Sequence, residues 1–437
     1  MSFPTYPEYK NSGVEWLGEV PAHWTVAPLK RCATIYNGKD HKDVETEDGD
    51  FPVIGSGGEF SRACNYLYDG ESILLGRKGT IDKPLYVNGK FWTVDTMFYS
   101  IASPQSNGRF LYYSALKIPF SMYSTNTALP SMTQESLSGH LMAIPPLVEQ
   151  ATIASFLDHE TAKIDALIEE QRRLIDLLKE KRQAVISHAV TKGLDPNAPM
   201  KDSGVEWLGE VPAHWRVVKV KHAAKLESGH TPSKANPEYW DGGIPWVSLN
   251  DSKALAQHDY IANTRFSISS AGIENSSARM LPPGAVVFTR DATIGLAAIT
   301  TKEMSVSQHL IAWLCHADRV LPEYLLLVFY SMQGELERNT FGATLKTIGM
   351  PDIRRLWMPL PPLSEQRRIV DSVFQRREKL SEMIEQAENG IQLLHEHRSA
   401  LISAAVTGKI DVRGWRSAST PAETDYPKAA EDAARYG

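Results

Sequence analysis

The chain has 437 residues, of which 42% are apolar and 22% charged, as in ordinary water-soluble proteins of about two to four domains. Its longest apolar stretch, residues 324–330, is too short to cross a bilayer, and no secretory signal is visible, so we expect a cytoplasmic protein. Three scattered cysteines argue against a disulfide framework and a thiolate zinc site, and the net charge of −6 does not by itself indicate a nucleic-acid partner.

One module is written twice in this chain. The segment Ser12–Trp24, SGVEWLGEVPAHW, recurs unchanged at Ser203–Trp215, 191 residues further on. Ile144–Asp195 aligns without a gap on Leu360–Asp411, now 216 residues further on, so the second copy is 25 residues longer between these anchors. The flanks match while the middles diverge, which indicates a retained scaffold carrying variable parts.

The first globular segment, residues 1–143, is predicted to be of the α/β (α+β) class. Ile73–Leu75 predicts a short buried strand, and Arg109–Leu116 predicts a helix. Asn88-Gly89 stands between two apolar runs and predicts a tight β-hairpin, because this pair favours the positive φ values of such turns.

Residues 144–195 predict a long helix. It follows Pro145-Pro146, carries Glu149 in its first turn, where the helix dipole favours an acid, and ends at Gly193. At ~1.5 Å per residue it is roughly 67 Å long. Its apolar residues alternate by three and four and form a heptad seam: Ile153, Leu157, Ile164, Ile168, Ile175, Leu178, Val185 and Ala189.

The second globular segment, residues 196–359, is predicted to share the fold of the first. Strands are expected at Ala285–Thr289, Leu296–Thr300 and His309–Leu314, and a helix at Glu323–Glu337. Arg290–Ile294 aligns with Arg77–Ile81, each after an apolar strand. The two domains therefore have one fold and different loops.

Residues 360–411 repeat the long helix, with Glu365 in its first turn and Gly408 at its end. The seam recurs 216 residues further on, at Ile369, Val373, Leu380, Ile384, Ile391, Leu394, Leu401 and Ala405, and includes the polar residue Arg398. Neither helix can bury its apolar stripe alone, so we expect the two to form an antiparallel intramolecular coiled coil, giving a pseudo-two-fold molecule. The alternative is that each helix packs into its own globular domain. Residues 412–437, rich in Ala, Ser, Glu and Asp, predict a disordered tail.

The doubled SGVEWLGEVPAHW, the paired (I/L)PPLxEQ segments and the paired AVxxAVTxG-like helix ends resemble the specificity subunit of type I restriction–modification systems. The resemblance covers nearly the whole chain, up to Val412. It implies that each globular segment is a target-recognition domain that reads one half of a split, asymmetric site on double-stranded DNA. It also implies that the helices set the spacing and dock two methyltransferase subunits, and that restriction (motor-nuclease) subunits join them.

Motifs for chemistry are missing from the sequence. It contains no (N/D)PP(Y/F) segment of an adenine methyltransferase, no phosphate loop and no clustered metal ligands. We therefore expect no catalytic, cofactor-binding or metal-binding residue in this chain. The resemblance implies that S-adenosylmethionine, ATP and Mg are bound by the partner subunits.

Two sets of loops are candidates for contact with DNA. Arg77, Lys78 and Thr80 follow a strand, as do Arg290 and Thr293, and arginine is the usual partner of guanine in the major groove. Polar loops just before each long helix supply the other candidates: Ser124, Asn126, Thr127, Thr344 and Lys346. The alternatives are phosphate contact or an ordinary solvated turn.

The doubled tryptophans Trp16, Trp24, Trp207 and Trp215 are interpreted as pegs that lock each domain onto the helices. Identical residues in two domains that read different sequences argue against base stacking. A competing hypothesis is a coiled-coil adaptor with two protein-binding domains and no DNA role. A self-sufficient two-domain enzyme is weaker, because the motifs for its chemistry are absent.

Overall fold

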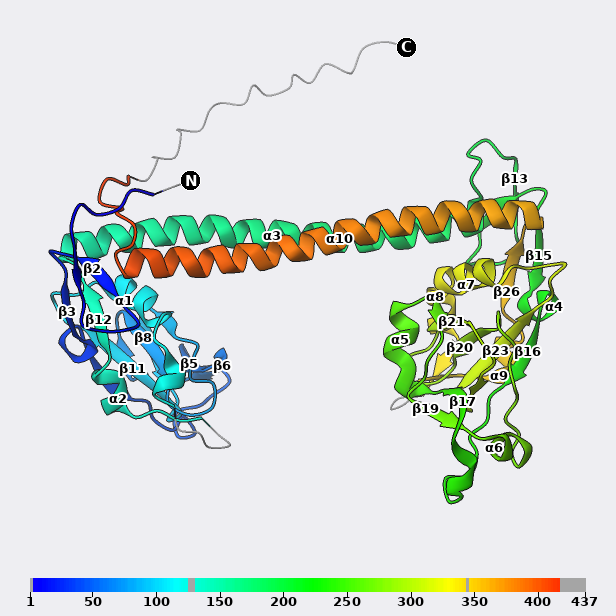
Figure 1. The fold of residues 1–437 in the computed structure, drawn as a ribbon, viewed down its shortest axis with the longest axis horizontal. Coiled ribbons are helices and arrows are strands. Elements are labelled where there is room, and N and C mark those ends of the chain that lie inside the picture. The colour runs from blue at the N-terminus through cyan, green and yellow to red at the C-terminus, as the bar shows by residue number, and fades with distance from the viewer. Residues whose placement is uncertain (1–2, 125–129, 343–345, 417–437) are drawn as a thin grey trace, which may run out of the picture. The chain divides into compact units, whose positions relative to one another are not determined.

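The computed structural model describes residues 3–124, 130–342 and 346–416 (Figure 1). The chain divides into two compact units. Unit 1 comprises residues 1–171 together with 389–437, and unit 2 comprises residues 172–388. Each unit therefore contains one globular domain and one half of each long helix.

The globular part of unit 1 is built on two four-stranded sheets, with strand orders β4-β11-β8-β9 and β6-β5-β10-β7. Two short antiparallel pairs, β1-β2 and β3-β12, complete it. Its strands are β1 (Tyr9–Asn11), β2 (Glu19–Pro21), β3 (Thr25–Pro28), β4 (Ala33–Asn37), β5 (Phe51–Gly55), β6 (Gly58–Ala63), β7 (Tyr68–Asp69), β8 (Ser72–Gly76), β9 (Leu85–Val87), β10 (Lys90–Thr93), β11 (Met97–Ala102) and β12 (Leu141–Ile144). Its short helices are α1 (Gly108–Ala115) and α2 (Gln134–Ser138).

The globular part of unit 2 has a five-stranded sheet, β16-β23-β20-β21-β18, and a three-stranded sheet, β19-β17-β22. The remaining pairs are β13-β14, β15-β26 and β24-β25. Its strands are β13 (Met200–Asp202), β14 (Glu210–Pro212), β15 (Arg216–Lys219), β16 (Ala224–Ser228), β17 (Trp240–Val247), β18 (Tyr260–Ile261), β19 (Phe266–Ile268), β20 (Val286–Thr289), β21 (Ala297–Thr300), β22 (Ser305–Val306), β23 (Leu310–Cys315), β24 (Thr340–Phe341), β25 (Thr347–Ile348) and β26 (Trp357–Leu360). Its helices are α4 (Val220–Ala223), α5 (Ser252–Gln257), α6 (Ser270–Glu274), α7 (Pro322–Ser331), α8 (Gln333–Arg338) and α9 (Met350–Ile353).

The two domains share their central pairings. β8 and β4 flank β11 in unit 1 as β20 and β16 flank β23 in unit 2, all antiparallel. β5 pairs with β10, and β17 with β22, both parallel. Most other pairs are antiparallel, so the α+β form of the predicted fold class describes the domains best.

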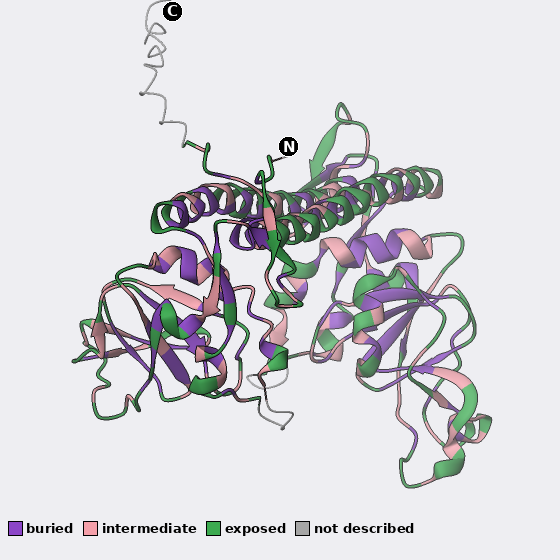
Figure 2. Cartoon of the chain, turned by 60° about the vertical axis from the view of Figure 1, so that its left-hand side comes forward, coloured by how far each residue is buried: buried purple, intermediate pink, exposed green. Residues whose placement is uncertain are grey.

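The long helices α3 (Leu147–Lys192) and α10 (Leu363–Val406) pack together antiparallel, as the seam predicts. In unit 1 the first half of α3, with Ile164 and Ile168, shares a core with the second half of α10, with Leu401 and Ile402. In unit 2 the last turns of α3 share a core with the first turns of α10. Buried and exposed residues alternate along both helices (Figure 2).

The predicted seam is buried at most of its positions, and Val185, Ile391 and Leu394 are half-buried. The polar seam residue Arg398 donates from Nε to Oδ1 of Asp165 at 2.9 Å. Shared cores between the two helices do not favour the alternative in which each helix packs into its own domain. Among the described residues, no helix is long and apolar enough to cross a membrane.

The glutamine of the doubled Glu-Gln pair ties the start of each long helix to its domain. Gln150 donates to the carbonyl of Pro145 at 2.9 Å and accepts from the backbone of Asn107, which caps α1. Gln366 repeats this with the carbonyl of Pro361 at 2.9 Å and the backbone of Leu321, at the start of α7. One buried amide thus fastens each domain to its long helix.

The preceding glutamate holds the doubled segment, with different strength in the two units. Glu149 accepts hydrogen bonds from Tyr6 at 2.5 Å and Trp24 at 3.0 Å, and pairs with His23 at 2.8 Å. Glu365 pairs with His214 at 2.8 Å, while the buried indole nitrogen of Trp215 has no hydrogen-bond partner among the described residues. Trp24 and Trp215 are both fully buried, in the position expected of pegs.

The predicted hairpin at Asn88-Gly89 is wrong. β9 pairs with β8, whereas β10 pairs with β5 and β7, so the two strands belong to different sheets. Gly89 exchanges two backbone hydrogen bonds with Gly70 instead, at 3.1 and 3.2 Å. Pairing with distant strands has overridden the local turn preference.

Two boundaries also differ from the sequence prediction. The helix expected at Glu323–Glu337 is two helices, α7 and α8, which meet at Met332. The ordered chain continues past Asp411, since Val412 is buried and the ring of Trp415 lies 5.7 Å from that of Phe156. The rest of the tail predicted to be disordered, residues 417–437, lies outside the described residues.

Candidate nucleic-acid interface

The loop after β8 in unit 1, residues 77–81, presents three of the predicted site residues. The backbone of Arg77 donates to the carbonyl of Thr96 at 2.9 Å, and Gly79, with φ +83°, donates to Pro130 at 2.9 Å. Lys78 and Thr80 are exposed, whereas Arg77 is half-buried. The Arg77 guanidinium lies 5.9 Å from the centre of the Phe98 ring and donates to the Asp95 carbonyl at 3.2 Å.

The loop after β20 in unit 2, residues 290–294, has the same backbone contacts. Arg290 donates to the carbonyl of His309 at 3.0 Å, and Ala292, with φ +64°, donates to the carbonyl of Lys346 at 2.9 Å. Thr293 and Lys346 are exposed, and Arg290 is half-buried. The predicted residues Arg290, Thr293 and Lys346 are therefore brought together.

The side chains on this shared backbone differ in charge. The exposed Lys78 of unit 1 corresponds to Asp291 in unit 2, which is buried. Asp291 pairs through Oδ2 with Nδ1 of His309 at 2.7 Å, and its Oδ1 lies 3.5 Å from Nε of Arg290. The two loops therefore offer different hydrogen-bonding groups from the same place in the fold.

The second set of predicted DNA contacts, in the polar loops before the long helices, lies only partly within the described residues. Ser124 lines a cleft of about 520 Å³ together with Gly79 of the β8 loop, so this part of the prediction comes together in unit 1. Asn126, Thr127 and Thr344 lie outside the described residues.

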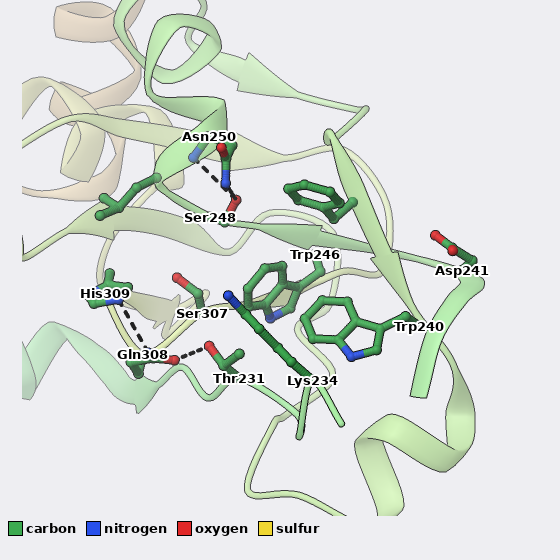
Figure 3. A pocket seen from close by; sticks show the side chains of 12 residues that line it. Thr231, Lys234, Trp240, Asp241, Trp246, Ser248, Asn250, Ser307, Gln308 and His309 are labelled. Atoms are coloured by element: carbon green, nitrogen blue, oxygen red, sulfur yellow. Dashed lines mark hydrogen bonds between the residues drawn. The ribbon is translucent and has the colours of Figure 1, made fainter. Parts of the chain in front are cut away.

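Sequence reasoning missed a pocket in unit 2, beside β17 (Figure 3). This β17 pocket has a volume of about 650 Å³. Its aromatic wall is formed by Trp240, Trp246 and Phe266, and its polar side chains include Ser248, Asn250, Ser307, Gln308 and His309. His309 was assigned to a strand, but β23 begins one residue later, at Leu310. The polar run Ser307-Gln308-His309 between Val306 and Leu310 was the available signal.

The loops that begin each domain are fixed by close backbone approach. A Cβ atom on Gly38 would lie 2.0 Å from the carbonyl oxygen of Val94, and one on Gly229 would lie 2.0 Å from that of Ser307. The indole of Trp92 donates to the Lys39 carbonyl at 3.0 Å, and that of Trp246 to the His230 carbonyl at 3.1 Å. The two domains thus make the same contact with tryptophans from strands that are not equivalent, β10 in unit 1 and β17 in unit 2.

The adjoining loop of unit 1 is acidic as well as basic. The carboxylate of Asp40 accepts from the backbone of Lys42 at 3.1 Å, and this bond holds the pKa of Asp40 below its usual value. His41 lies 3.7 Å from both Asp40 and Glu45.

The described loops supply hydrogen-bond donors and acceptors. Within residues 3–124, 130–342 and 346–416, no three His, Cys, Asp or Glu side chains come together to hold a metal ion. The arrangement suits recognition of a polar, charged surface such as the edges and phosphates of DNA.

Comparison with known proteins agrees with this arrangement. Residues 21–176 and 212–393 match the family described as "Type I restriction modification DNA specificity domain", once in each copy. The MjaIX specificity subunit of Methanocaldococcus jannaschii is 29% identical over 188 residues, which cover 41% of this chain and 43% of that protein. The EcoBI specificity subunit of Escherichia coli is 21% identical over 454 residues, covering 95% of this chain and 92% of that one.

A solved structure supports the same fold. One chain from a study of complex assembly and conformational transition in the type I R-M system superposes with a TM-score of 0.69 and 15% identity. The match covers 89% of this chain and 98% of that one.

Proposed function

The chain belongs to the family of type I restriction–modification DNA specificity proteins, and from this premise we propose that it reads a split, asymmetric site on double-stranded DNA, one half with each domain. It is the DNA sequence-specificity subunit of such a system. The observation that carries the proposal is the pair of equivalent loops: one backbone frame presents Lys78 in unit 1 and the Asp291–His309 pair in unit 2. Two domains with one frame and different polar groups suit the reading of two different half-sites.

The long helices are proposed to fix the spacer between the half-sites and to dock two methyltransferase subunits. Helices of 46 and 44 residues, tied to their domains by Gln150 and Gln366, support a rigid spacer. Restriction (motor-nuclease) subunits would join this assembly. S-adenosylmethionine, ATP and Mg would be bound by the partner subunits, and this chain would contribute base recognition and geometry.

The hypothesis of an adaptor without a DNA role is not favoured, because both copies match a DNA specificity family. The test is the methylome of a host that carries this chain with its methyltransferase subunit. We expect one bipartite motif with two different halves and a fixed spacer. Methylation of a continuous or palindromic motif would contradict the proposal.

Arg77 and Arg290 are proposed to contact DNA, one in each half-site. If the contact is bidentate to guanine, Arg77→Ala and Arg290→Ala should each cost about 1–3 kcal/mol of binding free energy and relax one half of the motif. If the contact is to phosphate, affinity should fall for all sequences and the salt dependence should weaken by about one charge. Thr80→Ala and Thr293→Ala, on the same loops, serve as uncharged comparisons.

A further inference from the structure

The β17 pocket of unit 2 holds a buried polar group with no partner. Ser307 is 1% exposed and lines the pocket, and its hydroxyl oxygen has no hydrogen-bond partner among the described residues. Figure 3 shows Ser307 on the polar side, near Gln308, with the indoles of Trp240 and Trp246 on the other side. A buried hydroxyl without a partner is unfavourable, so a ligand that hydrogen-bonds to it would gain affinity.

The equivalent space in unit 1 is filled with apolar side chains. Val94 occupies the position of Ser307, as the matching contacts of Gly38 and Gly229 establish, and it belongs to a core with Val53, Ile54 and Trp92. The ring of Phe60 also covers Gly55, at 3.3 Å from where a Cβ atom would lie. The shared fold therefore does not by itself require a pocket at this position.

The chemistry of the walls matches a nucleobase. Trp240 and Trp246, with ring centres 5.1 Å apart at an interplanar angle of 89°, offer flat apolar surface for stacking. Asn250 donates to Ser248, and the Gln308 amide contacts Thr231 and His309. Each amide keeps a further donor and acceptor position, which can pair with the edge of a base. Lys234, on the same pocket, is an exposed cation suited to the attached phosphate.

The pocket adjoins the proposed DNA-reading loop. His309 lines the pocket and pairs with Asp291 at 2.7 Å, and its carbonyl accepts from Arg290. Edges of paired bases are read by side chains that protrude into a groove. A concave aromatic pocket instead suits a base that has left the stack.

We propose that the β17 pocket binds one nucleobase that has left the base stack of the DNA bound by unit 2. This inference rests on the proposed function. Stacking on one of the two perpendicular indoles, with the other against the edge of the base, and a hydrogen bond to Ser307 offset the cost of unpairing. The base left behind in the opposite strand is then without its partner.

The experiment uses the full chain with its methyltransferase subunits and a duplex carrying the motif found from the methylome. Permanganate reports unpaired thymines, chloroacetaldehyde reports unpaired adenines and cytosines, and kethoxal reports unpaired guanines, so together they probe every position. The methyltransferase subunits extrude their own target bases, which the methylome identifies, so the reactive partners of those bases are set apart. We expect one further reactive base, the abandoned partner, within the half-site of unit 2. Ser307→Val, which installs the unit 1 residue, should abolish that reactivity, and Trp240→Leu should abolish it and weaken duplex binding roughly ten-fold.

Ser305→Ala is the matched control, because Ser305 is also buried with an unpaired hydroxyl but does not line the pocket. It should leave the reactive base unchanged. In a second arm the four deoxynucleoside monophosphates are titrated against the full chain, with tryptophan fluorescence as the readout. Saturable quenching that Ser307→Val removes supports the nucleobase chemistry.

The outcomes separate the two proposals. Specific binding and an intact motif, with no further reactive base and no quenching, overturn the pocket proposal and leave the proposed function standing. Quenching by mononucleotides with no further reactive base in the duplex overturns the DNA source and assigns the pocket to a free nucleotide. Absence of any sequence-specific binding overturns the proposed function itself.

Discussion

In each domain a glycine lies against the residue just after an equivalent strand, but the side chains around this contact differ between the two domains. In unit 1, Gly38 lies against Val94, and the tryptophan at this contact, Trp92, comes from β10. In unit 2, Gly229 lies against Ser307, the tryptophan, Trp246, comes from β17, and the β17 pocket lies beside it. The comparison indicates that the shared backbone is held by this close contact, which leaves no room for a Cβ atom on Gly38 or Gly229. The side chains on it are free to differ, as two half-sites of different sequence require.

The largest expected effect is on these glycines. Gly38→Ala and Gly229→Ala should each destabilise their own domain by more than about 3 kcal/mol, because a Cβ atom would clash with a backbone carbonyl. Hydrogen exchange of the full chain, followed separately in β4 and β16, measures this. Gly57→Ala and Gly334→Ala, which have open space, are the controls. Small losses of stability in both Gly38→Ala and Gly229→Ala would mean that the close backbone contact does not hold the shared fold in place.

The glutamate anchors should differ between the units. Glu149→Ala removes the acceptor of Tyr6 and Trp24 and should cost about 3 kcal/mol, whereas Glu365→Ala loses one exposed histidine and should cost at most about 1 kcal/mol. Hydrogen exchange in the first turns of α3 and α10 resolves the two sites. Glu149→Gln keeps an acceptor and should recover part of the loss. Equal losses at Glu149 and Glu365 would contradict this asymmetry.

The stability of unit 1 should depend on pH through His140, whereas unit 2 has a leucine, Leu356, at the equivalent position. Burial lowers the pKa of His140 to about 4. The unfolded histidine binds a proton below about pH 6.5, whereas the folded one does so only near pH 4. The free energy of unfolding of unit 1 is therefore unaffected by His140 above pH 6.5 and decreases as the pH falls towards 4. The loss amounts to at most about 3 kcal/mol.

His140→Leu tests this by making unit 1 resemble unit 2. The variant should flatten the decline in stability of unit 1 between pH 7 and pH 5, with hydrogen exchange of β12 as the measurement. The partner hydroxyl of Tyr123, 2.8 Å from His140, is half-buried and can turn to solvent. An unchanged pH slope would assign the decline to other groups.

The sequence predicted what repeats and missed what depends on distant partners. The seam from Ile153 to Ala189 and the stops at Gly193 and Gly408, with φ of +77° and +75°, follow from local periodicity and backbone preference. The backbone pairing at Asn88-Gly89 is with Gly70, and no local sequence pattern reveals this partner. The β17 pocket likewise needs Trp240, Trp246 and Ser307, which meet only through the sheet β19-β17-β22 and the turn that follows β22.

The contacts of the predicted site residues with DNA remain predictions. Arg77 and Arg290 could be singled out because each follows an apolar strand in aligned loops. The Asp291–His309 pair could not, because the two residues are 18 positions apart and meet through the pairing of β20 with β23.

Exchange of one domain tests the central claim most directly. Residues 25–143 are replaced by the equivalent domain of a relative with a different known motif, and the methylome of a host carrying the chimera is sequenced. The account predicts that one half of the motif changes to that of the donor, while the other half and the spacer stay as in the parent. A motif in which both halves change would contradict the claim that each domain reads its half independently.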